Sequence, residues 1–93
     1  MKAMWNNEII AESDDVLFFD NNQYFPPDSL KKDFFKQASN TTVCSWKGTA
    51  NYFDVVVKGK INEGAAWYYA NPSQAAEQIK GRIAFWKGVI LSK

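Results

Sequence analysis

The tripeptide Trp-Lys-Gly occurs twice in this chain, as Trp46-Lys47-Gly48 and as Trp86-Lys87-Gly88. A third tryptophan, Trp67, stands next to a pair of tyrosines in the segment 65–69. Indole and phenol rings can wall a site for a flat ring, a methyl group or a cation, through stacking and cation–π attraction. Because each glycine indicates a turn, both tripeptides are expected at strand ends. We therefore predict an aromatic cleft at one end of a sheet.

Eight residues form the predicted lining of this cleft. They are Tyr24, Cys44, Trp46, Lys47, Tyr52, Trp67, Tyr69 and Trp86. Alternation along a strand places Trp67 and Tyr69 on one face and Tyr68 on the other. For any single aromatic residue, the alternative is that it fills the core of a small domain.

Cys44 and Lys47 are the residues of this set that could do more than bind. A thiolate nucleophile needs a lowered pKa, and Lys47 is close enough in sequence to supply a positive charge. The alternative for Cys44 is a buried, inert side chain. Lys47 could instead reach an anionic group of a ligand, or it could be an exposed turn lysine. Lys87 is expected to be an exposed turn lysine. Arg82 is expected in a surface ion pair.

Several chemistries are excluded or unsupported. The chain has no histidine and one cysteine, which excludes imidazole catalysis and a standard structural zinc site. No spaced pair of carboxylates stands near the aromatic motifs, and the glycines are too isolated for a phosphate-binding loop. We therefore expect no metal and no cofactor, assign no catalytic residue, and favour binding over catalysis.

Length and charge limit the organisation and the partners. The 93 residues predict one domain spanning residues 1–93. A net charge of +1 predicts no nucleic-acid partner, and the lack of a long apolar run predicts no membrane association. The single cysteine indicates a reducing compartment, so we expect a cytoplasmic protein. The oligomeric state is open.

The pattern of short apolar runs and turn residues predicts a mainly β fold, α+β at the margin, with antiparallel sheets and two short helices. Expected strands are residues 4–5, 9–11, 16–19, 23–25, 42–46, 52–57 and 65–69, followed by a terminal hairpin of 83–86 with 89–91. An amphipathic helix is predicted over 27–37 and a second from Pro72, with Asn71 as its N-cap, to Gly81. Asn6-Asn7 and Asp20-Asn21-Asn22 are expected to form turns in a meander of short N-terminal strands. Residues 39–42 are expected to form a loop, and residues 62–64 a turn.

Four ordered motifs give the chain a resemblance to the domain of unknown function 427 family. They are Tyr24-Phe25-Pro26-Pro27, Cys44-Ser45-Trp46-Lys47-Gly48-Thr49-Ala50-Asn51-Tyr52, Ala65-Ala66-Trp67-Tyr68-Tyr69 and Ile79-Lys80-Gly81-Arg82-Ile83-Ala84-Phe85-Trp86. The resemblance covers about residues 4–89. The family is sometimes labelled a nucleotidyltransferase, a chemistry that would need carboxylates holding a divalent metal.

The family resembles the β-tent folds, which include Mss4-like proteins, methionine sulfoxide reductase B and the thalidomide-binding domain of cereblon. This implies two small antiparallel sheets that meet at an angle. Several of these relatives bind zinc through two cysteine pairs, a pattern that Cys44 alone cannot supply. Others bind small ligands in a tryptophan cage, which makes a cage of Trp46, Trp67 and Trp86 more plausible.

Three functional hypotheses follow. The first is a small binding domain that holds a small-molecule ligand in the aromatic cleft. The second is an enzyme in which Cys44 or a tyrosine reacts and Lys47 tunes it. The third is a protein-interaction module that works through exposed sheet edges or an apolar patch.

Overall fold

The fold of residues 1–93, described by a computed structural model, is built from nine strands and three short 3-10 helices. The strands are β1 (Lys2–Trp5), β2 (Glu8–Glu12), β3 (Leu17–Phe19), β4 (Asn22–Tyr24), β5 (Phe35–Cys44), β6 (Gly48–Val57), β7 (Lys60–Tyr68), β8 (Ile83–Phe85) and β9 (Ile90–Ser92). The helices are η1 (Pro27–Ser29), η2 (Lys32–Phe34) and η3 (Gln74–Ile79). All strand pairs are antiparallel, so the predicted mainly β class is confirmed. The kinship with β-tent folds stays a prediction.

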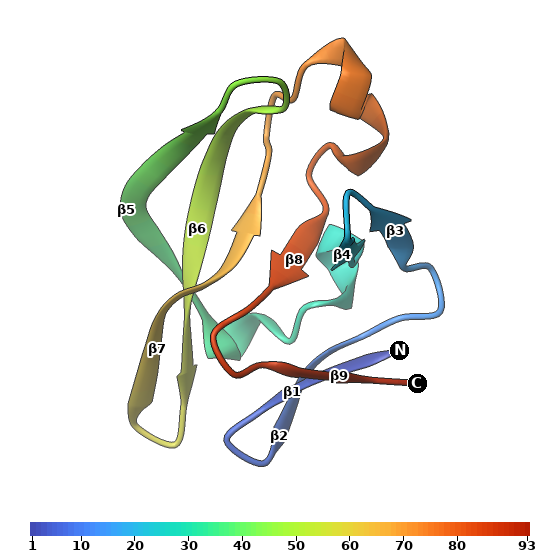
Figure 1. Cartoon of the computed structure of the whole chain (residues 1–93). Coiled ribbons are helices and arrows are strands. Elements are labelled where there is room, and N and C mark those ends of the chain that lie inside the picture. Colours follow the sequence, from blue (N-terminus) through green and yellow to red (C-terminus); the bar gives the residue numbers. More distant parts are fainter.

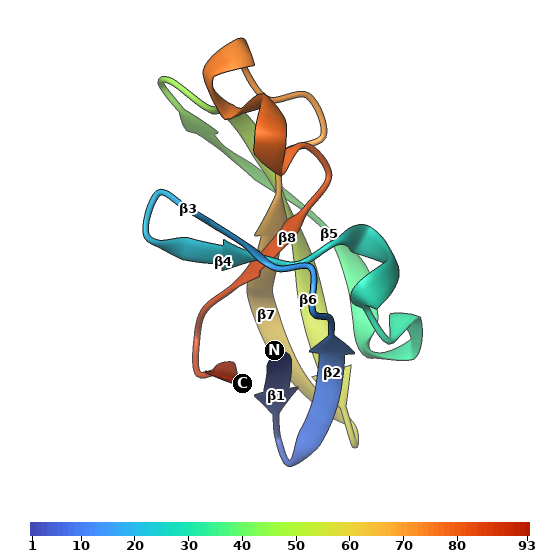
Figure 2. The ribbon, with the colours of Figure 1, turned by 90° about the vertical axis from the view of Figure 1, so that its right-hand side faces the viewer.

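The centre of the molecule is a four-stranded sheet with the order β5-β6-β7-β8 (Figure 1). The β3–β4 hairpin joins this sheet through Phe25, whose backbone N–H and C=O both bond to Ile83. Figure 2 shows that this hairpin projects to one side of the central sheet, while the segment of η1 and η2 lies on the other. The hairpin is thereby held beside the end of β8.

Two hairpins form where the sequence predicted them. Asn6 and Asn7 join β1 to β2, and Asp20 and Asn21 join β3 to β4. All four have positive φ angles, between 48° and 66°. Asn and Asp tolerate this left-handed conformation better than other residues with a side chain, which makes a two-residue turn feasible here.

The predicted terminal hairpin is wrong. β8 pairs with β7, whereas β9 crosses to β1, where Lys2 lies opposite Ser92. The turn at Lys87 and Gly88 therefore carries the chain from one sheet to another. As a result, both chain ends lie side by side in the three-stranded sheet β2-β1-β9 (Figure 1).

The predicted helix over residues 27–37 is also wrong. The chain forms two single 3-10 turns and then enters β5 at Phe35, which pairs with Val55. The ring of Phe35 packs edge-on against Phe53, at 5.8 Å between centroids. This packing in the strand outweighs the helical spacing of the apolar residues. The predicted loop at 39–42 is also part of β5, where Thr41 and Thr42 pair with β6.

The remaining two corrections concern residues 62–81. The second predicted helix is reduced to the 3-10 helix η3, which has a kink at Ala76. The predicted turn at 62–64 does not interrupt β7; instead a β-bulge forms there, with Gly64 at φ 62°. The backbone N–H of Gly64 donates to Asp54 Oδ1 at 2.8 Å, which satisfies a group that the bulge leaves unpaired. None of the helices has the length and hydropathy that a membrane crossing requires.

Two hydrophobic clusters stabilise the fold. The first joins the N-terminal sheet to the central sheet: Ala3, Ile10, Ala11, Phe25, Val55, Val57, Ala65, Ala66, Ile83 and Phe85. The second involves η3 and the β3–β4 hairpin: Tyr24, Ala50, Tyr69, Ala76, Ile79 and Ala84. Two of the six members of the second cluster are tyrosines, so polar hydroxyls lie within or beside apolar packing there. This second cluster positions the candidate site.

Candidate functional site

Three strands bring two of the tryptophans together. Tyr52 on β6 lies directly opposite Trp67 on β7, and Trp67 lies opposite Ala84 on β8. Trp86 comes two positions after Ala84. Because residues two apart along an extended chain point to the same side, the Trp86 side chain lies on the same face as Trp67. The rings of Trp67 and Trp86 meet edge to face, with centroids 5.9 Å apart.

Trp86 is held by its backbone and by its ring. Its backbone N–H donates to the Ala65 carbonyl at 3.0 Å, and its indole Nε1–H donates to the Gly64 carbonyl at 2.6 Å. The bulge at Gly64 exposes this carbonyl to the indole. A side chain at Gly64 would begin 3.8 Å from the Tyr52 ring and would need a positive φ. The bulge therefore helps to fix one wall of the site.

The other wall comes from the turn between β5 and β6. Gly48 has a φ of 119°, which side chains rarely permit, and an added Cβ would lie 3.4 Å from the Asn71 carbonyl oxygen. The segment after β7 packs closely here. The Ser73 backbone N–H donates to the Lys47 carbonyl at 2.8 Å, and the Ser73 hydroxyl donates to the Trp46 carbonyl. These bonds hold the backbone of Trp46 and Lys47 in place.

Lys47 is only 7% exposed and is the one buried charged residue. Its ammonium group forms an ion pair with the carboxylate of Asp20, in the β3–β4 turn. The same ammonium lies 5.2 Å from the ring centroid of Trp46 and 5.8 Å from that of Tyr69. Burial alone would lower the pKa of Lys47, but the bond to Asp20 and the nearby tyrosines outweigh it and raise this pKa. Lys47 is therefore a fixed, charged donor.

Two tyrosines surround this lysine and remain protonated at neutral pH. Burial raises the pKa of Tyr24, and Trp67 and Lys47 offset this only in part. Burial likewise raises the pKa of Tyr69. The Tyr24 hydroxyl is fully enclosed and forms no hydrogen bond of acceptable geometry, even with the neighbouring Trp67 indole. The site thus holds a buried polar group without a partner.

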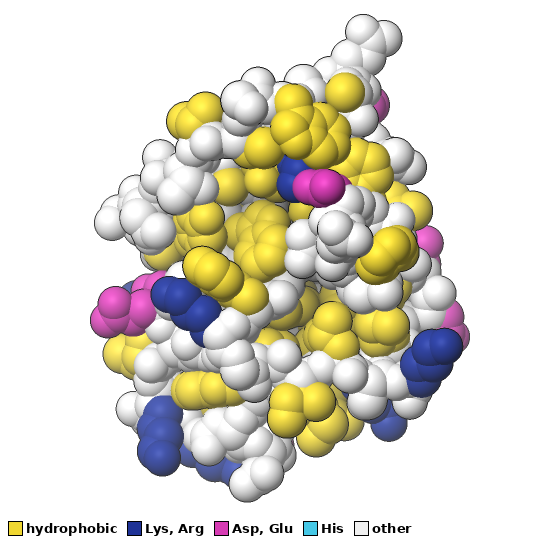
Figure 3. All heavy atoms as spheres, in the orientation of Figure 1, with side chains coloured by type: hydrophobic (Ala, Val, Ile, Leu, Met, Phe, Trp, Pro, Cys, Tyr) yellow, Lys and Arg dark blue, Asp and Glu magenta, His cyan; other side chains and the backbone are white.

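A cavity of about 180 Å³ opens between these walls. Its lining residues are Lys47, Tyr52, Trp67, Tyr69 and Trp86. Five of the eight predicted residues line it, while Tyr24, Cys44 and Trp46 lie beside it, in contact with its walls. Hydrophobic side chains surround a hollow on this face, with one acidic and one basic side chain in contact at its rim (Figure 3). That these residues bind a ligand stays a prediction.

A comparison with protein-family models matches residues 1–91 to the family described as a domain of unknown function, DUF427. The chain belongs to the DUF427 family. The match spans nearly all of its length, so the resemblance predicted from the four motifs is confirmed. A search of curated proteins finds no match to this DUF427 domain.

Cys44 occupies a distinct place at the end of β5. The neighbouring backbone N–H groups of Trp46 and Lys47 lower the pKa of the Cys44 thiol, and the Lys47 charge adds to this effect. The side chain is half-buried and is the free thiol of this DUF427 domain. It is therefore neither sealed in the core nor fully solvated.

Two site residues were missed by sequence reasoning. Asp20 was assigned only to a turn, yet its carboxylate neutralises Lys47. Phe19 lies between Trp46, at 5.9 Å, and Tyr24, at 6.4 Å, and Tyr24 in turn contacts Trp67 at 6.5 Å. Because β3 is remote in sequence from the Trp-Lys-Gly motifs, no local signal connects it to them. With Phe19, the rings of Trp46, Trp67 and Trp86 belong to one continuous chain of aromatic contacts.

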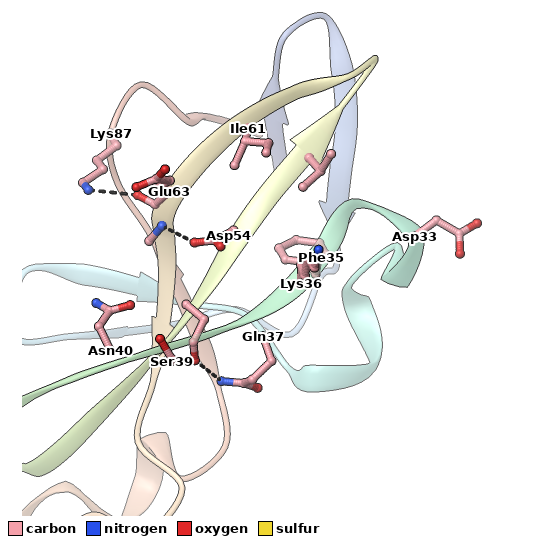
Figure 4. A pocket seen from close by; sticks show the side chains of 13 residues that line it. Asp33, Phe35, Lys36, Gln37, Ser39, Asn40, Asp54, Ile61, Glu63 and Lys87 are labelled. Carbon is pink, nitrogen blue, oxygen red and sulfur yellow. Dashed lines mark hydrogen bonds between the residues drawn. The ribbon is translucent and has the colours of Figure 1, made fainter.

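The largest hollow of the DUF427 domain, about 790 Å³, lies elsewhere, over β5, β6 and β7 (Figure 4). The hollow is lined by both acidic and basic side chains, and two of them already form hydrogen bonds with the backbone. Asp54 caps the Gly64 N–H, and Lys87 Nζ donates to the Glu63 carbonyl at 2.9 Å. Nowhere in the structure do three or more side chains of metal-binding type come together. The smaller aromatic cavity is therefore the better candidate site.

Proposed function

We propose that this DUF427 domain binds a small molecule, or the end of a larger one, that combines one flat ring with a hydrogen-bond acceptor. The cavity of about 180 Å³ is smaller than a drug-sized pocket. An engineered apolar cavity of about 150 Å³ accepts benzene, so the size suits a single ring. Trp67 and Trp86 provide the aromatic walls for this ring.

Lys47 is the observation that carries this proposal. An ammonium group has three N–H donors, and Asp20 is its one protein partner. The Tyr69 hydroxyl, which lines the same cavity, also forms no hydrogen bond within the protein. Unused donors next to aromatic walls favour a ligand with a carbonyl or carboxylate oxygen. A cationic ligand is disfavoured, because Lys47 already occupies the cation–π position on Trp46 and Tyr69.

A ligand screen by thermal shift tests the proposal. The probes are single-ring carboxylates and amides, each paired with the same ring bearing a trimethylammonium group. We expect stabilisation by some acids or amides, loss of that stabilisation in Trp86→Phe and Lys47→Met, and its retention in Trp46→Phe, since Trp46 does not line the cavity. Stabilisation by the ammonium compounds, or equal shifts in Trp86→Phe and the unmodified protein, would contradict it.

The lowered pKa of Cys44 supports a second candidate function, in which this thiolate acts as a nucleophile. The rate of alkylation by iodoacetamide as a function of pH tests it. We expect a midpoint below about 8.5, the ordinary value for a cysteine. A midpoint at or above that value, or no alkylation of the folded protein, would remove Cys44 from consideration.

The cellular compartment and the class of partner are proposed from the sequence. A lone cysteine fits the reducing cytoplasm, and a net charge of +1 disfavours nucleic acid as a partner. We expect a small-molecule partner and no membrane association.

A further inference from the structure

A second hollow, of about 570 Å³, differs from the aromatic cavity in position and in character. Its lining shares no residue with the cavity and contains no acidic side chain: Pro27, Leu30, Lys32, Phe35, Phe53, Tyr68, Ala70, Lys80, Gly81 and Ile83. We call this hollow the apolar groove. It lies between the η1–η2 segment, the central sheet and the Lys80-Gly81 turn.

Three aromatic rings give the apolar groove its surface. Phe53 and Tyr68 are stacked, with centroids 5.0 Å apart and planes 27° apart, and Phe35 packs edge-on against Phe53. The Tyr68 hydroxyl donates to Gln37 Oε1 at 3.0 Å, so the polar end of this tyrosine is already bonded. All three rings are half-buried, so each keeps part of its surface in contact with water. Apolar surface left in a concavity of this size is typical of a binding site.

Lys32 and Lys80 supply the charge of the apolar groove. Both are exposed, and neither takes part in an ion pair, since the two ion pairs of the protein are Lys47–Asp20 and Arg82–Asp15. Asp28 and Asp33 lie on the same connecting segment as Lys32, but neither contacts it within ion-pair distance. Two unneutralised ammonium groups therefore line a hollow whose other side chains are apolar.

We propose that the apolar groove binds an anionic amphiphile, namely a carboxylic acid with an apolar alkyl body. The body lies on Phe35, Phe53 and Tyr68, and the carboxylate is held by Lys32 and Lys80. The charge complementarity selects against an alkyl ammonium ion of the same length, which would meet two like charges. This site is independent of the aromatic cavity and of the function proposed for it.

Titration with decanoate below its micelle concentration, followed by ¹⁵N–¹H NMR of the whole chain, tests the proposal. We expect saturable shifts of amides at the groove, such as Leu30, Ala70 and Gly81, and none of comparable size at Lys47. Decyltrimethylammonium is the matched probe and is expected to bind at least tenfold more weakly. Equal binding of the two probes, or shifts centred on the Lys47 cavity, would overturn the proposal.

Substitutions sharpen the test without touching the core. Lys32→Gln together with Lys80→Gln should weaken decanoate binding roughly tenfold, as expected for losing two exposed charge contacts. Ala70 is exposed, so Ala70→Glu should fold normally and repel the carboxylate, whereas Ala70→Gln, of the same shape, should bind nearly as well as the unmodified protein. Trp86→Phe should bind decanoate unchanged. If Ala70→Glu binds as tightly as Ala70→Gln, the carboxylate does not lie in this groove and the proposal fails.

Discussion

The two copies of Trp-Lys-Gly have the same sequence and different surroundings. The tryptophans are similarly exposed, Trp46 at 44% and Trp86 at 47%. The lysines differ: Lys47 is buried and paired with Asp20, whereas Lys87 is exposed and bonds to a backbone carbonyl. The difference comes from the β3–β4 hairpin, which brings Asp20 to the first copy. A local motif thus places a lysine beside an indole, while a distant hairpin decides whether that lysine is buried.

The largest expected loss of stability comes from replacing the glycines of the two copies, and it should differ between them. Gly48→Ala should lower the free energy of unfolding by about 2–3 kcal/mol, because φ is 119° and the new Cβ approaches the Asn71 carbonyl. Gly88→Ala should cost about 1–2 kcal/mol, because φ is 84° and no atom lies within 4 Å of the added Cβ. Urea denaturation measures both. Equal losses would show that the packing against Asn71 adds nothing to the strain.

The lysines provide the second test. Lys47→Met should destabilise by about 1–2 kcal/mol, less than for a fully enclosed pair because the Asp20 side chain is 42% exposed. Lys87→Met should change stability by no more than about 0.5 kcal/mol. Asp20→Asn is the matched control and should approach the Lys47→Met value. A Lys47→Met protein as stable as Lys87→Met would mean that burial of the ammonium group cancels the gain from its ion pair.

The site around Lys47 also predicts a loss of stability in alkali. The pKa values of Lys47, Tyr24 and Tyr69 are raised in the folded state. The favourable contribution of Lys47 is complete below its unfolded pKa of about 10.4 and is lost as pH rises through the folded value. Above about pH 10 the two tyrosines ionise more readily in the unfolded chain, because burial disfavours the phenolate in the folded one, and this favours unfolding. The free energy of unfolding should therefore fall above about pH 10.

Tyr24→Phe is the variant that checks this dependence. It removes a hydroxyl that has no partner, so stability at neutral pH should be unchanged or higher by up to about 1 kcal/mol. The alkaline decline should also become shallower, since one of the three groups no longer ionises. Urea denaturation from about pH 8 to about pH 11 measures both effects. A marked loss at neutral pH would reveal a hydrogen bond to Tyr24 that the geometry does not show.

The tryptophans are expected to show the smallest effect, and here the second Trp-Lys-Gly copy should lose more stability than the first. Trp86→Phe loses the bond from Nε1 to the Gly64 carbonyl and should cost about 1 kcal/mol. Trp46→Phe loses no such bond and weakens one cation–π contact, so about 0.5 kcal/mol is expected. Thermal unfolding of the two variants, followed by circular dichroism, compares them. A larger loss in Trp46→Phe would give Trp46 the greater structural role.

The sequence predicted the fold correctly where the conformational preferences of neighbouring residues determine the local structure. The pairs Asn6-Asn7 and Asp20-Asn21 adopt left-handed turns because few other residues do so readily. The helix predicted around Phe34 and Phe35 failed because pairing of Phe35 with Val55 is a long-range contact that local spacing does not report. The turn predicted at Gly64 failed for a related reason. Asp54, ten residues earlier, caps the bulge and lets β7 continue.

The sequence predicted which residue types line the site, but only part of the contacts that these residues make with other side chains. Alternation correctly placed Trp67 and Tyr69 on one face, where both line the cavity, while Tyr68 lines the apolar groove. The exposure expected for Lys87 and the surface ion pair expected for Arg82 are confirmed. The burial of Lys47 depends on Asp20, which no sequence spacing connects to it. The apolar groove was not predicted at all, because its lining comes from four separate segments.

The pairing of β1 with β9 has a consequence for the order of folding. β1 is the central strand of its sheet, yet one of its two neighbours is the last strand of the chain. During synthesis, β1 and β2 can form their hairpin early, but one edge of β1 must wait unpaired until β9 has left the ribosome. Closing so long a loop is slow, which leaves that edge open to pairing with other chains in the meantime.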